Sequence, residues 1–132
     1  MNVFVDTSGL LAVLDASDAA HRRAAAAWTR LLETEGSLVT TSYVLVELTA
    51  LAQARLGVAA VRDIDRVLVP LMRVVWIDET FHTRGMAALL AAGRRKLSLV
   101  DCVSFEVMRE GGITSAFTLD PDFRAQGFER IP

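Results

Sequence analysis

Four acidic residues stand where their side chains could meet in a metal-binding cluster: Asp6, Glu47, Asp101 and Asp120. Asp6 ends an apolar run in "FVDTSG", and Asp120 ends another in "SAFTLD". The two histidines lie far apart and the single cysteine stands alone, so the available ligands are oxygens, which prefer hard cations such as Mg²⁺ or Mn²⁺. Carboxylates packed together repel one another, so such a cluster needs cations. The site would suit hydrolysis of phosphodiester bonds, in which the metal activates water and offsets charge on phosphate.

Three of these acids also have a purely structural explanation. Asp6 can cap the helix that follows it, because aspartate is a preferred N-cap residue. Ser98 and Asp101 have the spacing of a capping box. Asp120 precedes a proline, as an N-cap often does, and Asp122 suits the dipole of the same short helix. Taken one at a time, these acids therefore do not require a metal.

Glu47 has no such explanation, because it lies too far inside its expected helix (43–56) to cap it. Val44 and Leu51 lie on the apolar stripe of that helix, and Glu47 falls between them. A carboxylate among buried aliphatic side chains is costly unless it is paired or binds a metal. The alternative is a glutamate at the edge of the stripe that reaches water. A single cluster explains all four acids, whereas caps explain only three.

The elements that must position these acids alternate between strands and helices along the chain. β-branched and aromatic runs predict strands, and apolar periodicity bounded by Gly or Pro predicts helices. Asp18 is the predicted N-cap of the second helix. The predicted strands span 2–5, 37–41, 73–77 and 114–119, and the predicted helices span 9–14, 18–33, 43–56, 58–69, 79–92 and 100–110, with a helical turn from Asp120. This order favours a parallel sheet covered by helices on both faces, with ligands beyond the carboxyl ends of its strands.

Composition bounds the class of protein. The chain has 132 residues, of which 52% are hydrophobic, and we expect a single domain over residues 1–132 with a sizeable core. The formal net charge of −2 excludes a strongly basic coat for nucleic acid. Cys102 cannot form an internal disulfide, and the N-terminus lacks the pattern of a signal peptide. No uncharged apolar run approaches the roughly 20 residues that span a bilayer, so we expect a cytoplasmic protein without a membrane partner.

Four motifs in this order give the chain a resemblance to a known family: "VDTSG" at Asp6, "SYVLVEL" around Glu47, "SLVDCVSF" around Asp101, and "AFTLDPDF" at Asp120. The chain resembles the PIN-domain family over essentially its whole length, and most closely the VapC-type toxin ribonucleases of bacterial toxin–antitoxin pairs. The resemblance implies a PIN-like three-layer α/β/α fold with a central, twisted parallel sheet. It also implies an endoribonuclease that inhibits translation and depends on Mg²⁺, for which Mn²⁺ would substitute. The implied partners are an RNA substrate, a cognate antitoxin protein and a second copy of the chain in a homodimer.

The resemblance also carries specific site residues. It implies that Asp6, Glu47, Asp101 and Asp120 are catalytic and bind the metal, with Asp6, Asp101 and Asp120 on the first ion and Glu47 on its water shell or on a second ion. The implied accessory ligands are Asp122, Thr7 and Ser8.

Several other residues are open to two interpretations. The cluster "GRRK" at 93–96 could contact phosphate or could balance a helix dipole. Thr118 and Ser104 could orient water or phosphate, although local bonds to the backbone are more common for such residues. A groove for the antitoxin is expected between helices 18–33 and 43–56, unless the apolar residues involved belong to the core. Those residues are Trp28, Leu31, Leu32 and Leu51.

Other classes of protein also place aspartates at the ends of strands. An aspartate-dependent phosphotransfer domain would need a second aspartate two residues after the first, where this chain has Ser8, or a lysine after a late strand, whereas Lys96 is the only lysine. A non-catalytic PIN-fold module that binds RNA or protein would be expected to lose the acids. All four are present, which favours an enzyme.

Overall fold

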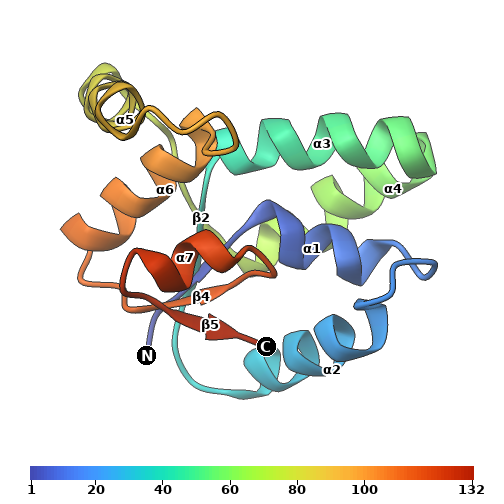
Figure 1. The fold of residues 1–132 in the computed structure, drawn as a ribbon. Helices are drawn as coiled ribbons and strands as arrows, with labels where there is room; N and C mark the ends of the chain where they lie inside the picture. The colour runs from blue at the N-terminus through green and yellow to red at the C-terminus, as the bar shows by residue number, and fades with distance from the viewer.

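The computed structural model describes residues 1–132. Five parallel strands form the central sheet, in the order β3-β2-β1-β4-β5. The strands are β1 (Val3–Val5), β2 (Leu38–Thr41), β3 (Arg73–Val75), β4 (Ser115–Phe117) and β5 (Glu129–Ile131). The helices are α1 (Thr7–Leu14), α2 (His21–Glu33), α3 (Ser42–Leu56), α4 (Val58–Asp63), α5 (Glu79–Ala92), α6 (Leu99–Glu110) and α7 (Pro121–Ala125), with π-helical η1 (Ile64–Leu68) and 3₁₀-helical η2 (Val69–Leu71) after α4. Figure 1 shows helices on both sides of this sheet, which confirms the predicted three-layer α/β/α fold.

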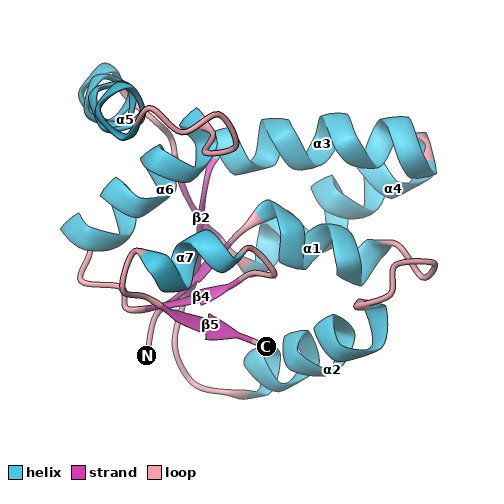
Figure 2. Cartoon of the chain, in the orientation of Figure 1, coloured by secondary structure: helices cyan, strands magenta, loops and turns pink.

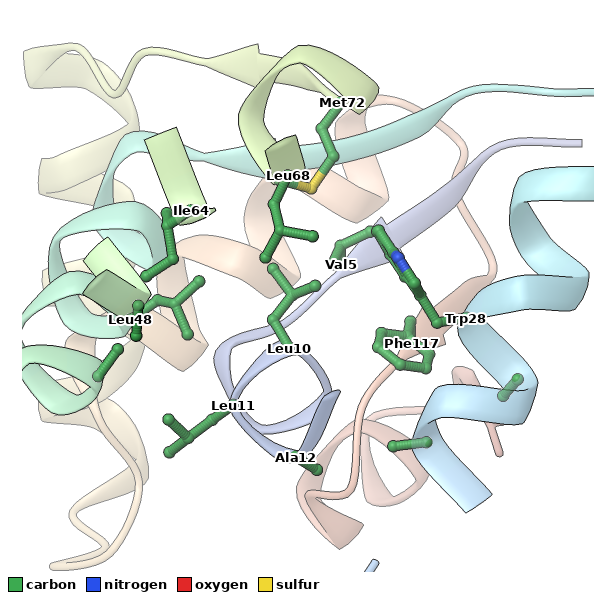
Figure 3. Packing of buried hydrophobic residues seen from close by; sticks show 14 of the residues in the cluster. Val5, Leu10, Leu11, Ala12, Trp28, Leu48, Ile64, Leu68, Met72 and Phe117 are labelled. Carbon is green, nitrogen blue, oxygen red and sulfur yellow. The ribbon is translucent and has the colours of Figure 1, made fainter. Parts of the chain in front are cut away.

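Two hydrophobic clusters lie on opposite faces of the sheet. All three residues of β1 are buried, and alternate side chains enter different clusters, with Val3 and Val5 in one and Phe4 in the other. In the first cluster α1 lies between α2 and α3, and Trp28 of α2 packs on Phe117 of β4 with 5.3 Å between ring centroids (Figure 3). The second cluster is built mainly by α6, together with residues of α7 and α3. A strand buried on both faces explains the continuous apolar run at the start of the chain.

Gly9 allows α1 to lie directly on β4. A Cβ atom at this position would come within 2.6 Å of the Phe117 ring and 2.9 Å of its carbonyl oxygen. Any larger residue would therefore push α1 away from the sheet. This close approach also brings Ser8, in the first turn of α1, next to the residues that follow β4.

Two predicted helices begin or continue differently. The helix predicted from residue 18 begins at His21, because Asp18 Oδ1 accepts a hydrogen bond from Ala20 N at 2.8 Å and so forms a turn instead of a cap. The helix predicted over 58–69 divides into α4, η1 and η2. Pro70 has no N–H and its ring would clash with the carbonyl four residues earlier, so the α-helical hydrogen-bond ladder cannot continue to it.

The sequence did not predict β5, which pairs with β4 through Ala116↔Arg130 and Phe117↔Ile131. Its three residues carry no strong strand signal, and pairing with β4 decides their conformation. None of the helices combines the length and apolar character that crossing a bilayer requires.

Candidate functional site

β1 is the central strand of the sheet, with β2 and β3 on one side of it and β4 and β5 on the other. Such a switch of the chain from one side to the other leaves a crevice beyond the carboxyl ends of the strands. A cavity of about 430 Å³ lies there, where the loops of Figure 2 lead from β1 into α1 and from β4 into α7. Its lining comprises Asp6, Thr7, Ser8, Leu11, Asp18, Glu47, Leu51, Arg55, Ser98, Asp101, Leu119 and Asp120. The structure therefore brings the four predicted acids together.

Asp6 is the most deeply buried acid of the cavity, at 3% exposure. It occupies the N-cap position of α1, yet its side chain makes no capping hydrogen bond. Its Oδ2 atom instead accepts hydrogen bonds from Ser8 Oγ at 2.9 Å and from Thr118 Oγ1 at 2.8 Å. The structure thus argues against the cap interpretation of Asp6.

Backbone N–H groups orient the two hydroxyls that bind Asp6. Leu119 N donates to Ser8 Oγ at 2.9 Å, and Asp120 N donates to Thr118 Oγ1 at 3.0 Å. Ser8 Oγ and Thr118 Oγ1 also lie 3.1 Å apart, and because an ionised carboxylate can only accept, each hydroxyl directs its single proton to Asp6. Of the two hydroxyl residues implied as accessory ligands, Ser8 contacts Asp6, whereas the Thr7 hydroxyl has no hydrogen-bond partner. Thr118 makes a local bond with Asp120 N, as expected, and also donates to the Asp6 carboxylate.

Asp101 begins α6 as part of a complete capping box. Asp101 N donates to Ser98 Oγ at 3.1 Å, and Ser98 N donates to Asp101 Oδ2 at 3.3 Å. The cap and the cavity position coexist, as the sequence suggested. Ser104, on the same helix, bonds only to the carbonyl of Val100, which is the local interpretation of that residue.

Asp120 is likewise both a cap and a wall of the cavity. Its Oδ1 accepts a hydrogen bond from Asp122 N at 2.9 Å at the start of α7. Asp122 forms an ion pair with Arg94 over 3.0 Å. Arg94, from the "GRRK" segment, therefore binds an acid at the edge of the cluster, which neither interpretation of that segment had predicted.

Glu47 lies on α3 between the buried Val44 and Leu48 and the cavity. It is only partly buried and makes no hydrogen bond or ion pair with the protein, so its carboxylate reaches water, as expected of a glutamate at the edge of the stripe. It nevertheless faces the same cavity as Asp6.

Burial and mutual repulsion raise the pKa values of two of the acids. Desolvation raises the pKa of Asp6, against the lowering effect of the bonds from Thr118 and Ser8, and the charge of Asp120 raises it further. Desolvation, followed by the charges of Asp6 and Asp120, raises the pKa of Asp101 from 3.8 to about 7. A nearby cation would favour the ionised forms of all of them.

The residues present fit a hard divalent cation. One carboxylate oxygen from each of Asp101, Asp120 and Asp122 lies within 4.8 Å of the others. Thr7 Oγ1 is buried in the cavity wall without any hydrogen-bond partner, and an orphaned hydroxyl of this kind needs an unseen ligand or water. Oxygen donors alone, without His or Cys, match the preferences of Mg²⁺ and Mn²⁺. The three acids whose oxygens lie within 4.8 Å of one another are thus Asp101, Asp120 and Asp122, whereas the family resemblance implied Asp6, Asp101 and Asp120 as ligands of the first ion.

Some residues of the cavity were not assigned to it from the sequence. Asp18, Arg55, Ser98 and Leu11 all contribute to the lining. Helical spacing relates Arg55 to Glu47 and Leu51, at steps of four residues, and this signal could have identified it. Asp18 lies in the irregular segment between α1 and α2, whose path no sequence pattern predicted.

Helices 18–33 and 43–56, the expected lining of an antitoxin groove, do not face each other, because α1 lies between α2 and α3. Trp28 is only 6% exposed and belongs to the core, while Leu31 packs against it. Leu51 lines the acidic cavity and also packs against the core, and Leu32 is exposed. The core interpretation was therefore the correct one for Trp28 and Leu31.

The fold and the cavity together define a class: parallel α/β proteins with a carboxylate-rich site at the strand ends, suited to metal-assisted phosphodiester hydrolysis. A family model described as PIN domain matches residues 3–129. The chain belongs to the PIN-domain family.

The similar proteins narrow this class. The 23S rRNA-specific endonucleases VapC20 of two Mycobacterium tuberculosis strains, CDC 1551 / Oshkosh and ATCC 25618 / H37Rv, are each 34% identical to this chain over 130 residues, which cover 98% of it and 97% of the relative. The crystal structure of M. tuberculosis VapC20, a sarcin–ricin loop cleaving toxin, superposes with a TM-score of 0.84 over 96% of this chain and 95% of that one. FitAcB from Neisseria gonorrhoeae, at 16% identity, shares the fold with a TM-score of 0.70 over 100% of this chain and 97% of that one. The predicted recognition of a PIN domain of the VapC toxin type, and of a nuclease, is confirmed.

Proposed function

We propose that this chain is the endoribonuclease toxin of a toxin–antitoxin pair, that it depends on Mg²⁺ or Mn²⁺, and that it acts through a single domain spanning residues 1–132. The observation that carries the proposal is the convergence of Asp6, Glu47, Asp101 and Asp120 on one cavity, where none of the four forms an ion pair with a basic side chain. The charge of Asp120 raises the pKa of Asp6, and the charges of Asp6 and Asp120 raise the pKa of Asp101. A cation bound among these three carboxylates would offset this repulsion.

The residues of the chain have distinct proposed roles. Asp6, Asp101 and Asp120 hold the metal, and Asp122 and Thr7 are accessory ligands at its edge. Ser8 and Thr118 fix the orientation of the Asp6 carboxylate. Glu47, which is partly solvated and unpaired, acts on the opposite wall, where it orients water or a second ion. A divalent cation bound here would supply Lewis-acid chemistry, which makes water a better nucleophile and offsets charge on the phosphate.

The proposed substrate is the sarcin–ricin loop of 23S ribosomal RNA, cleavage of which would inhibit translation. This proposal rests on the 34% identity to VapC20 over nearly the full length of both proteins. The proposed location is therefore the cytoplasm, where ribosomes are found. A cognate antitoxin is the proposed protein partner, and a basic side chain from it would complement the acidic cavity. A homodimer is also proposed.

The direct test is incubation of purified protein with ribosomes or total RNA, with Mg²⁺, with Mn²⁺ or with chelator, followed by primer extension along 23S rRNA. We expect one dominant cut in the sarcin–ricin loop that chelator abolishes and that either metal restores. Cleavage elsewhere in the RNA would reject the proposed substrate but keep the endonuclease. A folded wild-type protein that cleaves no RNA under any of these conditions would instead favour the non-catalytic binding module.

A further inference from the structure

Arg55 is the one basic residue in the lining of the acidic cavity. It lies in the last turn of α3, is exposed, and makes no hydrogen bond or ion pair with the protein. Two other arginines close to the acids are already engaged: Arg94 pairs with Asp122, and Arg130 donates to the carbonyl of Leu119. Arg55 therefore presents an unused guanidinium at the mouth of a site whose remaining charges are all negative.

Its place on α3 is related to the acid cluster by helix geometry. Glu47, Leu51 and Arg55 follow one another at four-residue steps and so lie on the same face of the helix. All three line the cavity. With a rise of about 1.5 Å per residue, the backbone of Arg55 lies about 12 Å along the helix from that of Glu47. The α3 face thus carries an acid at the proposed reaction centre, an apolar side chain in the middle, and a cation at the far end.

The surroundings of Arg55 do not explain it as a partner of another acid. Asp15 and Asp18 belong to the segment between α1 and α2, and both carboxylates already accept bonds there from backbone N–H groups. The pKa of Asp15 is lowered first by its hydrogen bonds from Ser17, and the charge of Arg55 contributes only after these. Neither acid forms an ion pair with the Arg55 guanidinium.

We propose that Arg55 binds a backbone phosphate of the RNA that flanks the scissile phosphate, and so positions the strand across the acid cluster. The inference rests on the proposed ribonuclease function. An acidic cavity repels a polyanion, and the fork of an arginine recognises phosphate with two parallel hydrogen bonds. Because the contact is made away from the reacting atoms, it would contribute to binding of the substrate and of the transition state equally.

The test compares Arg55→Ala with Arg62→Ala. Arg62 is a matched control, since it is exposed on α4, has no ion pair and lines a different cavity. The probe is a synthetic RNA hairpin with the sequence of the 23S rRNA sarcin–ricin loop, cleaved in Mg²⁺. We expect Arg55→Ala to raise KM about tenfold, the loss typical of a charge-assisted hydrogen bond, with kcat changed by less than about threefold. Arg62→Ala should change neither.

Two further measurements identify a phosphate as the ligand. The slope of log KM against log salt concentration should fall by about 0.7 in Arg55→Ala, as expected for one lost phosphate contact to a single strand, while Arg55→Lys should keep the slope. Single neutral methylphosphonate substitutions along the hairpin should include one that raises KM for the wild type but not for Arg55→Ala. Absence of any such position would overturn the proposal, as would an unchanged KM or salt slope in Arg55→Ala.

A merely structural Arg55, which stabilises the helix dipole, would lower the melting temperature of Arg55→Ala without changing KM, and this result would also overturn the proposal. Failure of the proposed nuclease function can be distinguished from failure of the Arg55 proposal. A wild type that binds the hairpin without cleaving it would reject the nuclease, and the same comparisons would then be made on Kd by fluorescence anisotropy. A wild type that does not bind the hairpin would overturn the Arg55 proposal for this substrate.

Discussion

Asp6 and Thr118 are separated by 112 residues in the chain, and the Thr118 hydroxyl donates a 2.8 Å hydrogen bond to Asp6 Oδ2. Their strands, β1 and β4, are neighbours in the sheet with Val5 opposite Phe117, so both residues leave the sheet at the same level. Gly9 lets α1 approach β4 closely enough for Ser8 to donate to Asp6 and to accept from Leu119 N. The orientation of Asp6, the most deeply buried acid of the cavity, is therefore a property of the β1–β4 pair.

Thr118→Val should weaken metal binding without unfolding the protein. The substitution keeps the shape of the side chain but removes one of two donors to a buried carboxylate, which costs about 1.5–3 kcal/mol for a hydrogen bond to a charged group. We expect the affinity for Mn²⁺, measured by isothermal titration calorimetry, to fall about tenfold or more on this basis. Ser104→Ala is the control, because that buried hydroxyl bonds only to the carbonyl of Val100. Equal Mn²⁺ affinities for the two variants would show that Thr118 does not orient Asp6 for the metal.

Asp6→Asn should abolish RNA cleavage and leave the protein folded. The amide keeps the size of the side chain and removes the charge that the metal requires. It also relieves burial of a carboxylate whose pKa desolvation raises, so the melting temperature in chelator should stay the same or increase. Asp63→Asn, at the exposed end of α4, is the control and should retain full cleavage. Undiminished cleavage by a well-folded Asp6→Asn protein would exclude Asp6 from the site.

The stability of the metal-free protein should decrease as the pH rises from about 4 to about 7. The pKa of Asp101 is about 7 in the folded protein, against an ordinary value of 3.8, so in this window the folded state holds a proton that the unfolded chain has released. One such proton lowers the free energy of unfolding by at most about 1.4 kcal/mol per pH unit. Urea denaturation in chelator, repeated across this range, measures the slope. Asp101→Asn should flatten it, and added Mg²⁺ should reduce it, whereas an Asp101→Asn protein with the wild-type slope would assign the effect to another group.

Glu47→Gln should alter the stability of the metal-free protein less than Asp101→Asn does. The apolar stripe around Glu47 and the capping role of Asp101 would by themselves predict the reverse order. In the structure Glu47 is partly solvated and free of partners, while burial and the charges of Asp6 and Asp120 act on Asp101. We expect Glu47→Gln to lower kcat while the melting temperature in chelator changes little. A markedly lower melting temperature for this variant alone would indicate a structural ion pair of Glu47.

The sequence predicted the acids of the site better than their surroundings. Carboxylates at strand exits were identifiable because parallel strands end at one edge of a sheet. The bonds from Ser8 and Thr118 were not, since they depend on how closely α1 approaches β4. Local propensity also failed to predict β5 and the π-helical η1. Pairing with β4 decides the conformation of β5. The missing N–H of Pro70 interrupts the helix that contains η1. The sequence left open whether Trp28 lines a surface groove or belongs to the core, and packing on Phe117 places it in the core.

The cleaved RNA should carry a 5′-phosphate on one product and a 3′-hydroxyl on the other. Ribonucleases that use the 2′-hydroxyl as nucleophile need a base and an acid near it, and histidines commonly serve. Neither histidine of this chain lines the cavity: His21 Nδ1 bonds to the carbonyl of Ala12, and His82 bonds to the hydroxyl of Tyr43. The cavity offers carboxylates and hydroxyls instead, which fits attack by water.

Attack by water does not use the 2′-hydroxyl of the scissile nucleotide. A 2′-deoxy substitution there should therefore slow cleavage only through weaker binding, so that KM rises while kcat is largely kept. Ligation of the products with an RNA ligase and extension of the 3′ end by a polymerase measure the two ends directly, and an acid-treated sample serves as the control for cyclic phosphate. Products that end in a 2′,3′-cyclic phosphate would reject attack by water even if Mg²⁺ proved essential, and would leave the carboxylates to position the RNA.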